Sequence, residues 1–316
     1  MTVIITYVSH WFSVSVSDRR VTLAASGAVH DDQANKVLLV RTEDAIVTIG
    51  YTGSAYVAGI PTDEWLARQI VPSLEPGPPS LSMRRHAIPQ RLNEVVARII
   101  VAVRQRSRFD RSFHSVEIGV GGCRDHRGDL WPFFVGINKP KQSSSVSFWA
   151  FPERPDRNYG KFYVWVSGGW GQYKRAIFAR MMTALEKINP AHDHSPEGVV
   201  DVLRDALLDF SNGEQSIGTD MMVVMTTPSR RKVEIWSEGE RQEWDDVAGR
   251  IASKYSAMVH TISYSPWIIG HQTVAPPMQL VADQQLTLSG YPIHLRGGQS
   301  GGKTMFLGMQ ARTPPP

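Results

Sequence analysis

The sequence has a single cysteine, Cys123, among its 316 residues, so no disulfide can form within the chain. This excludes a small secreted fold held together by disulfides and favours a reducing compartment. No run of about 18 consecutive apolar residues occurs, which excludes a membrane-spanning helix. With 42% hydrophobic and 20% charged residues, the composition also excludes a largely disordered or low-complexity chain.

Lysine is scarce in the first part of the chain. Of the 34 basic residues, 25 are arginine and 9 are lysine, and Lys36 is the only lysine among the first 138 residues. In a chain that otherwise uses arginine, a lone lysine indicates a position that needs a compact charge and a tunable pKa, which arginine does not offer. The net charge of +4 is mild for this length and does not predict nucleic-acid binding.

The N-terminus has neither the basic start nor the unbroken apolar stretch of a signal peptide. Residues 11–18 instead alternate apolar and small polar side chains, which is typical of a half-buried strand. Thr2 is small enough for cytosolic methionine aminopeptidase to remove Met1. We therefore expect a cytoplasmic protein whose mature chain begins at Thr2.

Hydrophobic periodicity divides the chain into alternating groups of strands and helices. Runs rich in β-branched residues predict strands at 3–9, 12–18, 36–41, 45–50, 115–122, 131–137, 146–152, 161–167, 220–227 and 232–237. Helical spacing of apolar residues predicts helices at 54–70, 89–107, 171–188, 196–211 and 244–261. The remainder has the pattern of short strands and turns.

The helices come in pairs between groups of strands, which argues against a doubly wound parallel sheet. Two stacked sheets with a helix pair on each outer face satisfy the burial pattern. We therefore predict an α+β fold with a core at residues 2–262 and a C-terminal β-rich extension at 263–316. The strands of this extension are too short to be stable alone, so we expect them to pack on the core or on a neighbouring subunit.

Four residues within the first fifty can cooperate chemically. Once Met1 is removed, Thr2 carries a hydroxyl nucleophile and an α-amine, whose ordinary pKa of about 7.7–8.0 suits a base. Lys36 can supply an ammonium near the nucleophile, and Asp18 a carboxylate that holds it in place. Gly50, at a strand end, can donate its N–H to an oxyanion. Taken singly, each of these residues is more often an ordinary turn or surface residue.

The spacing of these residues resembles the proteasome β-subunit family of N-terminal-nucleophile hydrolases. In that family an acid follows the nucleophilic threonine by sixteen residues, an arginine comes two residues later, and a glycine follows the lysine by fourteen. The matching residues are Thr2, Asp18, Arg20, Lys36 and Gly50. The interval from threonine to lysine is two residues longer here, and the extra length falls in the probable loop at 22–35.

Two later segments add to the resemblance. Val166-Ser167-Gly168-Gly169 is similar to the Ser-Gly element of the family, and 211–218 is similar to its Ser-rich loop, most of all in the bacterial Anbu-type homologues. The usual aspartate of that loop has no clear match. The resemblance covers residues 2–238 and implies a four-layer αββα sandwich in which Ser167 and Ser216 support the amine of Thr2.

The resemblance implies a threonine hydrolase that cleaves amide bonds, peptide bonds above all, without a cofactor or a metal. The partners it implies are copies of the same chain, in a ring or a helical homo-oligomer, and a peptide or amide substrate. No nucleic acid, membrane or particular unfoldase is indicated. Two alternatives stay open, namely a non-catalytic assembly subunit with the same fold and an amidase that acts on a small non-peptide amide.

Residues 297–304 match the phosphate-binding pattern G-x-x-x-x-G-K-[ST]. We reject a nucleotide site because only twelve residues follow, and these begin with the pattern of a strand where the motif requires a helix. A glycine-rich turn is the simpler interpretation. His192 and His194 lack the further ligands that a metal site needs and are interpreted as an exposed turn.

The intact mass of the purified protein tests the first requirement of this chemistry. We expect a mass that corresponds to a chain beginning at Thr2 with a free amine, because that amine is the base. A retained Met1 or an acetylated Thr2 would contradict the mechanism and favour the non-catalytic subunit.

Overall fold

The computed structural model describes most of the first three quarters of the chain and a series of short strands after it. The described residues are 2–22, 26–31, 34–74, 91–109, 113, 115–126, 129–140, 145–151, 162–168, 174–188, 196–227, 232–237, 262–264, 266–270, 273–275, 278–281, 285–288 and 291–294.

One main sheet is built from the beginning of the chain and from segments far along it. Its strands are Val3–Val8 (β1), Ser13–Asp18 (β2), Tyr163–Gly168 (β12), Met221–Thr227 (β13) and Lys232–Ser237 (β14). They are antiparallel and lie in the order β12-β1-β2-β13-β14. In this register Val3 lies opposite Gly168, and Asp18 lies opposite Met221. The start of β1 is therefore next to the end of β2.

The second main sheet has seven strands. They are Val37–Arg41 (β5), Ala45–Gly53 (β6), Val116–His126 (β9), Asp129–Lys139 (β10), Ser147–Phe151 (β11), Trp267–Gly270 (β16) and Thr273–Ala275 (β17). Their order is β11-β10-β9-β6-β5-β16-β17, and only the pairing of β16 with β5 is parallel.

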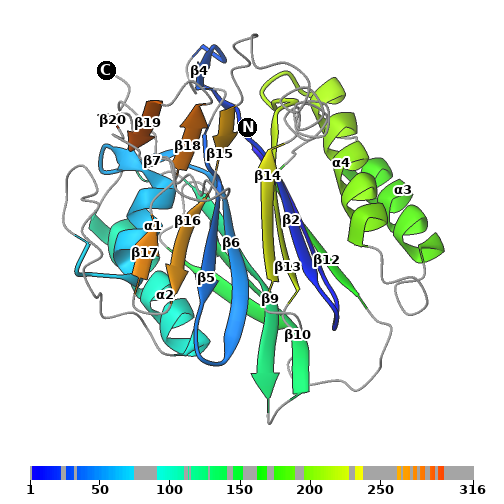
Figure 1. Ribbon diagram of the computed structural model, residues 1–316, viewed down its shortest axis with the longest axis horizontal. Coiled ribbons are helices and arrows are strands. Elements are labelled where there is room, and N and C mark those ends of the chain that lie inside the picture. Colours follow the sequence, from blue (N-terminus) through cyan, green and yellow to red (C-terminus); the bar gives the residue numbers. More distant parts are fainter. Residues whose placement is uncertain are drawn as a thin grey trace, which may run out of the picture.

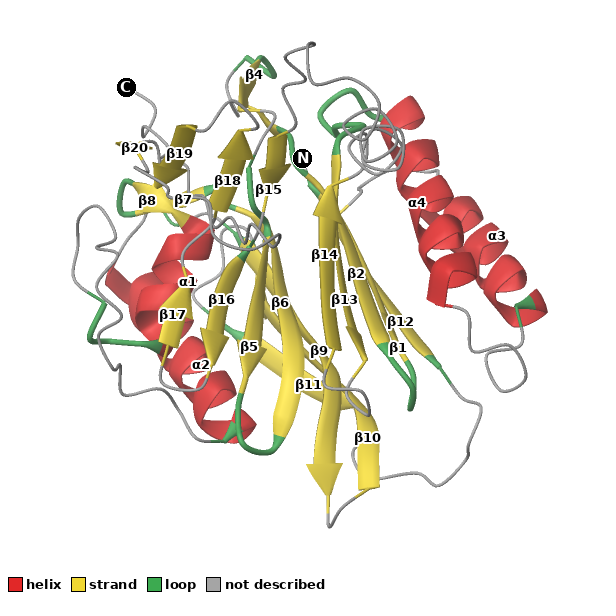
Figure 2. Ribbon diagram, viewed as in Figure 1, coloured by secondary structure: helices red, strands yellow, loops and turns green. Residues whose placement is uncertain are grey.

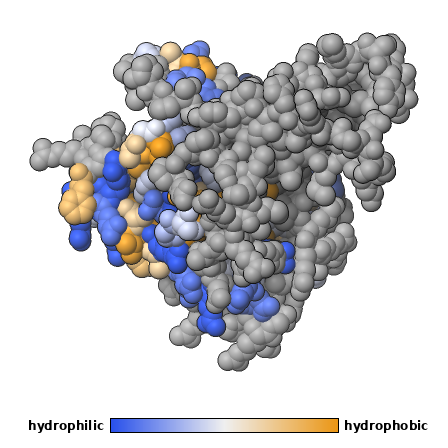
Figure 3. Space-filling model, turned by 60° about the vertical axis from the view of Figure 1, so that its left-hand side comes forward, coloured by the Kyte–Doolittle hydropathy of each residue, from blue (hydrophilic) through white to orange (hydrophobic). Residues whose placement is uncertain are grey.

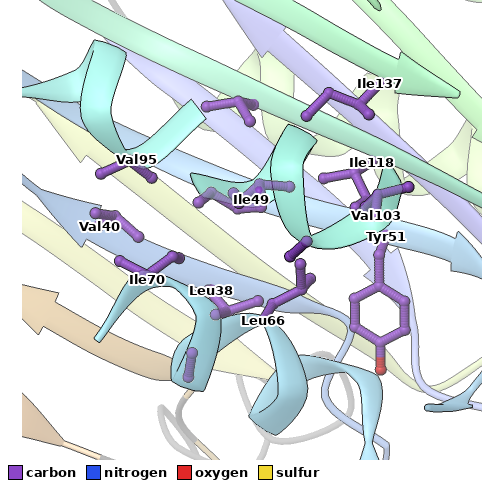
Figure 4. Close-up of a cluster of buried hydrophobic side chains, with 14 of the residues drawn as sticks. Leu38, Val40, Ile49, Tyr51, Leu66, Ile70, Val95, Val103, Ile118 and Ile137 are labelled. Carbon is purple, nitrogen blue, oxygen red and sulfur yellow. The ribbon is translucent and has the colours of Figure 1, made fainter. Parts of the chain in front are cut away.

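The two sheets face each other, and helices cover their outer faces (Figures 1 and 2). Helices Thr62–Ile70 (α1) and Leu92–Phe109 (α2) pack on the seven-stranded sheet, in a buried cluster to which Leu38, Ile49 and Ile118 contribute (Figure 4). Helices Lys174–Lys187 (α3) and Pro196–Gly213 (α4) pack on the five-stranded sheet. Each sheet thus has a hydrophobic core of its own on its helical side.

Small and hydroxyl-bearing residues fill much of the space between the sheets. The hydroxyl oxygens of Ser15 and Thr48, from opposite sheets, are 2.6 Å apart and share a hydrogen bond. A Cβ atom added to Gly121 would lie 2.7 Å from Cγ2 of Thr6, and one added to Gly119 would overlap the ring of Trp165. The sheets therefore approach closely, and their buried hydroxyl groups bond to one another.

Most predicted strands and helices correspond to observed ones, but the helix predicted at 54–70 begins only at Thr62. The residues before it form two short paired strands, Tyr56–Val57 (β7) and Ile60–Pro61 (β8). Pro61 occupies the N-cap with φ −54°, and a proline there has no N–H to continue a helix upstream. The predicted helix at 244–261 and the glycine-rich segment at 297–304 lie outside the described residues.

The remaining strands form small sheets. Val21–Thr22 (β3) pairs with Val29–Asp31 (β4), and a four-stranded sheet consists of Ile262–Tyr264 (β15), Met278–Val281 (β18), Gln285–Leu288 (β19) and Tyr291–His294 (β20). Although β16 and β17 follow residue 263, they belong to the seven-stranded sheet, so this part of the extension packs on the core. The domain boundary at 262/263 itself stays a prediction. In the part of the chain that the structure describes, no helix is both long and apolar enough to cross a membrane.

The apolar stripe predicted on 89–107 faces the core rather than solvent, because Val95, Ile99 and Val103 of α2 are fully buried. Val101 and Phe109 on the same helix are 50% and 86% exposed. In the view of Figure 3, the described hydrophobic residues on the surface lie among strongly hydrophilic ones. Self-association in a ring or a helix therefore stays a prediction, and Val101 and Phe109 are the large hydrophobic residues that α2 exposes.

Close packing between the sheets predicts a stability effect. Gly119→Ala should lower the free energy of unfolding by about 1–3 kcal/mol, because the new methyl group forces the Trp165 ring to move. Gly198→Ala in α4 is the matched control, because its methyl group would meet nothing closer than 3.5 Å. Urea unfolding of both variants checks this, and equal stabilities would show that the sheets can separate at no cost.

Candidate active site

The carboxylate of Asp18 is fully buried and accepts hydrogen bonds from four donor groups around it. Its Oδ1 accepts the N–H of Val3 at 2.8 Å. Its Oδ2 accepts Lys36 Nζ at 2.8 Å, and the N–H groups of Arg20 at 3.2 Å and Gly218 at 3.4 Å. Both oxygens of the carboxylate therefore have partners, and three of the four donors converge on Oδ2.

Lys36 is the cation of this cluster, and its side chain is 2% exposed. Besides the carboxylate of Asp18, its ammonium donates to the backbone carbonyl of Arg20. The backbone carbonyl of Lys36 accepts the N–H of Tyr51, which fixes the residue against β6. A buried ammonium requires such partners, because an unpaired charge away from water is costly. The structure thus brings together Asp18 and Lys36, the pair expected from the sequence.

Thr2 lies beside this pair, one residue before Val3. Its carbonyl is pressed against Gly168 at the end of β12, where any Cβ atom would overlap the carbonyl oxygen. Gly168 has φ +74°, a conformation that side-chain-bearing residues rarely adopt. The Ser-Gly element therefore contacts the beginning of the chain, and Thr2 is partly exposed where β1 begins.

The orientation of β6 argues against Gly50 as the oxyanion donor. Successive residues of a strand direct their N–H groups to opposite edges, and the N–H of Tyr51 points to Lys36. The N–H of Gly50 is therefore directed toward β9, where its partner in register is Gly119. Gly50 also faces Ile4, whose Cδ1 lies 3.0 Å from the position of an added Cβ atom.

Gly53 is an alternative donor that the sequence did not single out, and the role of either glycine stays a prediction. Gly53 ends β6 with φ +97°, is exposed, and shares the N–H direction of Tyr51. Across the β5–β6 hairpin, the register would place Ala34 opposite Gly53, and Ala34 precedes β5. The N–H of Gly53 therefore points past the end of β5. The Gly-Ser dipeptide at 53–54 is a turn signal that could have identified it.

The two serines expected to support the amine have other partners in the structure. The hydroxyl groups of Ser167 and Thr52 share a hydrogen bond of 2.8 Å. The hydroxyl of Ser216 donates to Oε1 of Glu214 at 2.9 Å. Glu214 is thus an acidic residue within the loop at 211–218, where the aspartate usual in the family has no clear match. Their roles toward Thr2 stay predictions.

The single cysteine is not a rival nucleophile. Cys123 is buried, burial raises the pKa of its thiol to about 12, and its Sγ lies 3.3 Å from the carbonyl oxygen of Ser9. It is therefore protonated at neutral pH, and the thiolate is the reactive form. Among the described residues, no three His, Cys, Asp or Glu side chains gather as metal ligands would, and His192 and His194 lie outside these residues.

No protein-family model matches the sequence, and no curated protein matches it either. Solved structures to which the chain is similar include Anbu from Hyphomicrobium sp. strain MC1 as a Gly-1 mutant, with 13% identity, a TM-score of 0.48 and coverage of 82% of this chain and 100% of that one. Another structure of Anbu from this strain has 12% identity, a TM-score of 0.46 and coverage of 81% and 99%.

Anbu (ancestral beta-subunit) from Yersinia bercovieri has 12% identity, a TM-score of 0.45 and coverage of 81% of this chain and 98% of that one. We base no assignment of chemistry on these likenesses, because one fold hosts many functions and identities this low say nothing of the site.

The buried pair predicts an asymmetry between two substitutions. Asp18→Asn should lower the free energy of unfolding by about 3–5 kcal/mol, because the ammonium of Lys36 loses its carboxylate partner inside the protein. Lys36→Met should cost less, since the carboxylate of Asp18 keeps three backbone N–H donors. Urea unfolding at neutral pH measures both, and a larger loss in Lys36→Met would contradict this picture of the site.

Proposed function

We propose that the protein is a threonine hydrolase of the N-terminal-nucleophile type that cleaves amide bonds, with peptides as the substrate class. The observation that carries the proposal is the Asp18 carboxylate, which binds the N–H of Val3 and the ammonium of Lys36 at 2.8 Å each. One buried group thereby fixes a cation next to Thr2. Removal of whatever precedes Thr2, here Met1, would then expose an α-amine on the residue that carries the hydroxyl.

In this mechanism the hydroxyl of Thr2 attacks the carbonyl carbon of the substrate, and its proton passes to the α-amine of the same residue. Lys36 stabilises the negative charge that develops on the hydroxyl oxygen. The protonated amine then gives its proton to the leaving nitrogen, and the C–N bond breaks to leave an ester on Thr2. Water, deprotonated by the amine, hydrolyses the ester and restores the hydroxyl.

The tetrahedral intermediate needs a donor for its oxyanion, and the orientation of β6 favours the N–H of Gly53 over that of Gly50. Glycine suits this position because its φ is +97° and an added Cβ atom would lie 2.4 Å from the carbonyl oxygen of Ser115. Ser167, Gly168 and Ser216 complete the surroundings of the amine in this proposal.

The arrangement of two facing sheets with outer helices supports the four-layer αββα sandwich of these hydrolases. Assembly with copies of the same chain, in a ring or a helix, belongs to the same proposal. A small-amide amidase would share the chemistry of Thr2 and differ only in substrate, so substrate trials separate the two.

Lys36→Arg is the variant that tests the catalytic role of this lysine. We expect amide hydrolysis to fall by at least ~10²-fold, because guanidinium keeps the charge but is larger and cannot be tuned in pKa. Lys139→Arg is the control, since Lys139 is also a buried lysine, 5% exposed, whose Nζ donates to the carbonyl of Phe113 at 2.6 Å. Hydrolysis of fluorogenic peptides by both variants, compared with wild type, is the measurement.

A peptide epoxyketone gives an independent readout, because it forms a ring with both the hydroxyl and the α-amine of an N-terminal threonine. We expect one adduct per wild-type chain on Thr2 by mass spectrometry, and none in Thr2→Ala. If neither peptides nor small acyl amides are hydrolysed and no adduct forms on a chain shown to begin at Thr2, the hydrolase assignment fails.

A further inference from the structure

Arg19 lies in the sequence between Asp18 and Arg20, and its side chain is fully buried. Its NH1 donates to Oδ2 of Asp220 at 3.2 Å, and its backbone N–H donates to the carbonyl of Asp220 at 3.1 Å. Two bonds between the same two residues, one through side chains and one through the backbone, fix the residue before β13 against the end of β2.

Arg19 also contacts the segment that leads to the lysine. Its carbonyl accepts the N–H of Ala34 at 2.9 Å, two residues before Lys36. The next residue, Arg20, accepts the ammonium of Lys36 through its carbonyl and donates a guanidinium N–H to the carbonyl of Gln215 at 3.0 Å. Residues 19 and 20 therefore connect the lysine segment to the loop that precedes β13.

That loop supplies one of the donors to Asp18. Gly218, two residues before Asp220, donates its N–H to Oδ2 of Asp18 at 3.4 Å. A Cβ atom at Gly218 would lie 2.8 Å from Cβ of Arg20, so the loop packs tightly on the backbone beside the site. This is the longest of the four bonds to Asp18, and a small shift of the loop would break it first.

We propose that the Arg19–Asp220 ion pair is a positioning device, which holds the loop against Asp18 and thereby fixes the direction in which that carboxylate presents Lys36 to Thr2. The inference rests on the proposed function. Neither Arg19 nor Asp220 touches the reacting atoms in this scheme, and both act through the orientation of Asp18. Since Asp220 is 43% exposed, it can be changed without leaving a buried void.

Asp220→Asn is the test variant, because it removes the charge and keeps the size. We expect kcat for peptide hydrolysis to fall roughly tenfold with KM unchanged. A 1 Å misplacement of reacting groups costs about 10²-fold, and a smaller shift of Lys36 should cost less. Asp220→Glu should restore most of the rate, since it restores the charge. Asp209→Asn is the matched control, because it removes the exposed Arg180–Asp209 pair on the outer helices and should leave kcat unchanged.

A second readout does not depend on activity. The rate at which acetic anhydride modifies Lys36, followed by mass spectrometry, should rise severalfold in Asp220→Asn and return toward wild type in Asp220→Glu. Lys139, which is also buried, should keep its rate in all variants and serves as the internal control.

These readouts separate the two ideas. If wild type hydrolyses nothing, the proposed function fails, while a faster modification of Lys36 in Asp220→Asn still shows that the ion pair positions the lysine. If Asp220→Asn lowers only thermal stability, with kcat and Lys36 reactivity unchanged, the Arg19–Asp220 pair only stabilises the fold and the positioning role is overturned.

Discussion

A single buried carboxylate, that of Asp18, sets the requirement that the surrounding chain has to meet. An ionised group in the interior is tolerated only when charge and hydrogen-bond partners surround it. Here the partners come from the start of β1, from the turn after β2, from the residue before β5 and from the loop before β13. Four stretches that are remote in sequence must therefore end at one place, and that place is where Thr2 lies.

The layers of the fold explain why this convergence is possible. Each sheet buries its own helix-covered core, so the space between the sheets does not have to supply most of the hydrophobic stabilisation. Hydroxyl groups such as those of Ser13 and Thr226, 2.7 Å apart, and glycines such as Gly119 share that space with a small hydrophobic cluster that includes Leu39 and Met222. Close approach of the sheets then allows strand ends from both of them to reach the same carboxylate.

Periodicity predicted most strands and the four helices of the described residues, because those signals lie within one element. The scarcity of lysine and the spacing from Thr2 pointed to Asp18 and Lys36, which the structure places 2.8 Å apart, while their catalytic roles stay proposals. The spacing of residues selected Gly50 alone, because N–H direction depends on hairpin register, which spacing does not contain, and the choice between Gly50 and Gly53 stays a proposal. The Arg19–Asp220 pair joins residues 201 positions apart, and no local pattern could reveal it. The predicted start of the first helix, at residue 54, was wrong because the apolar spacing runs on upstream of Pro61, which is the N-cap of α1.

The parallel pairing of β16 with β5 has a consequence for the timing of folding on the ribosome. Trp267 lies opposite Leu38, so the strand that follows Lys36 keeps one edge without its partner until most of the chain has been synthesised. Contacts between such distant residues form late and slow the folding of a domain. An unpaired edge also invites pairing with other chains. Nascent chains should accordingly complete this edge of β5, the strand that directly follows Lys36, only after residues 267–270 have been synthesised.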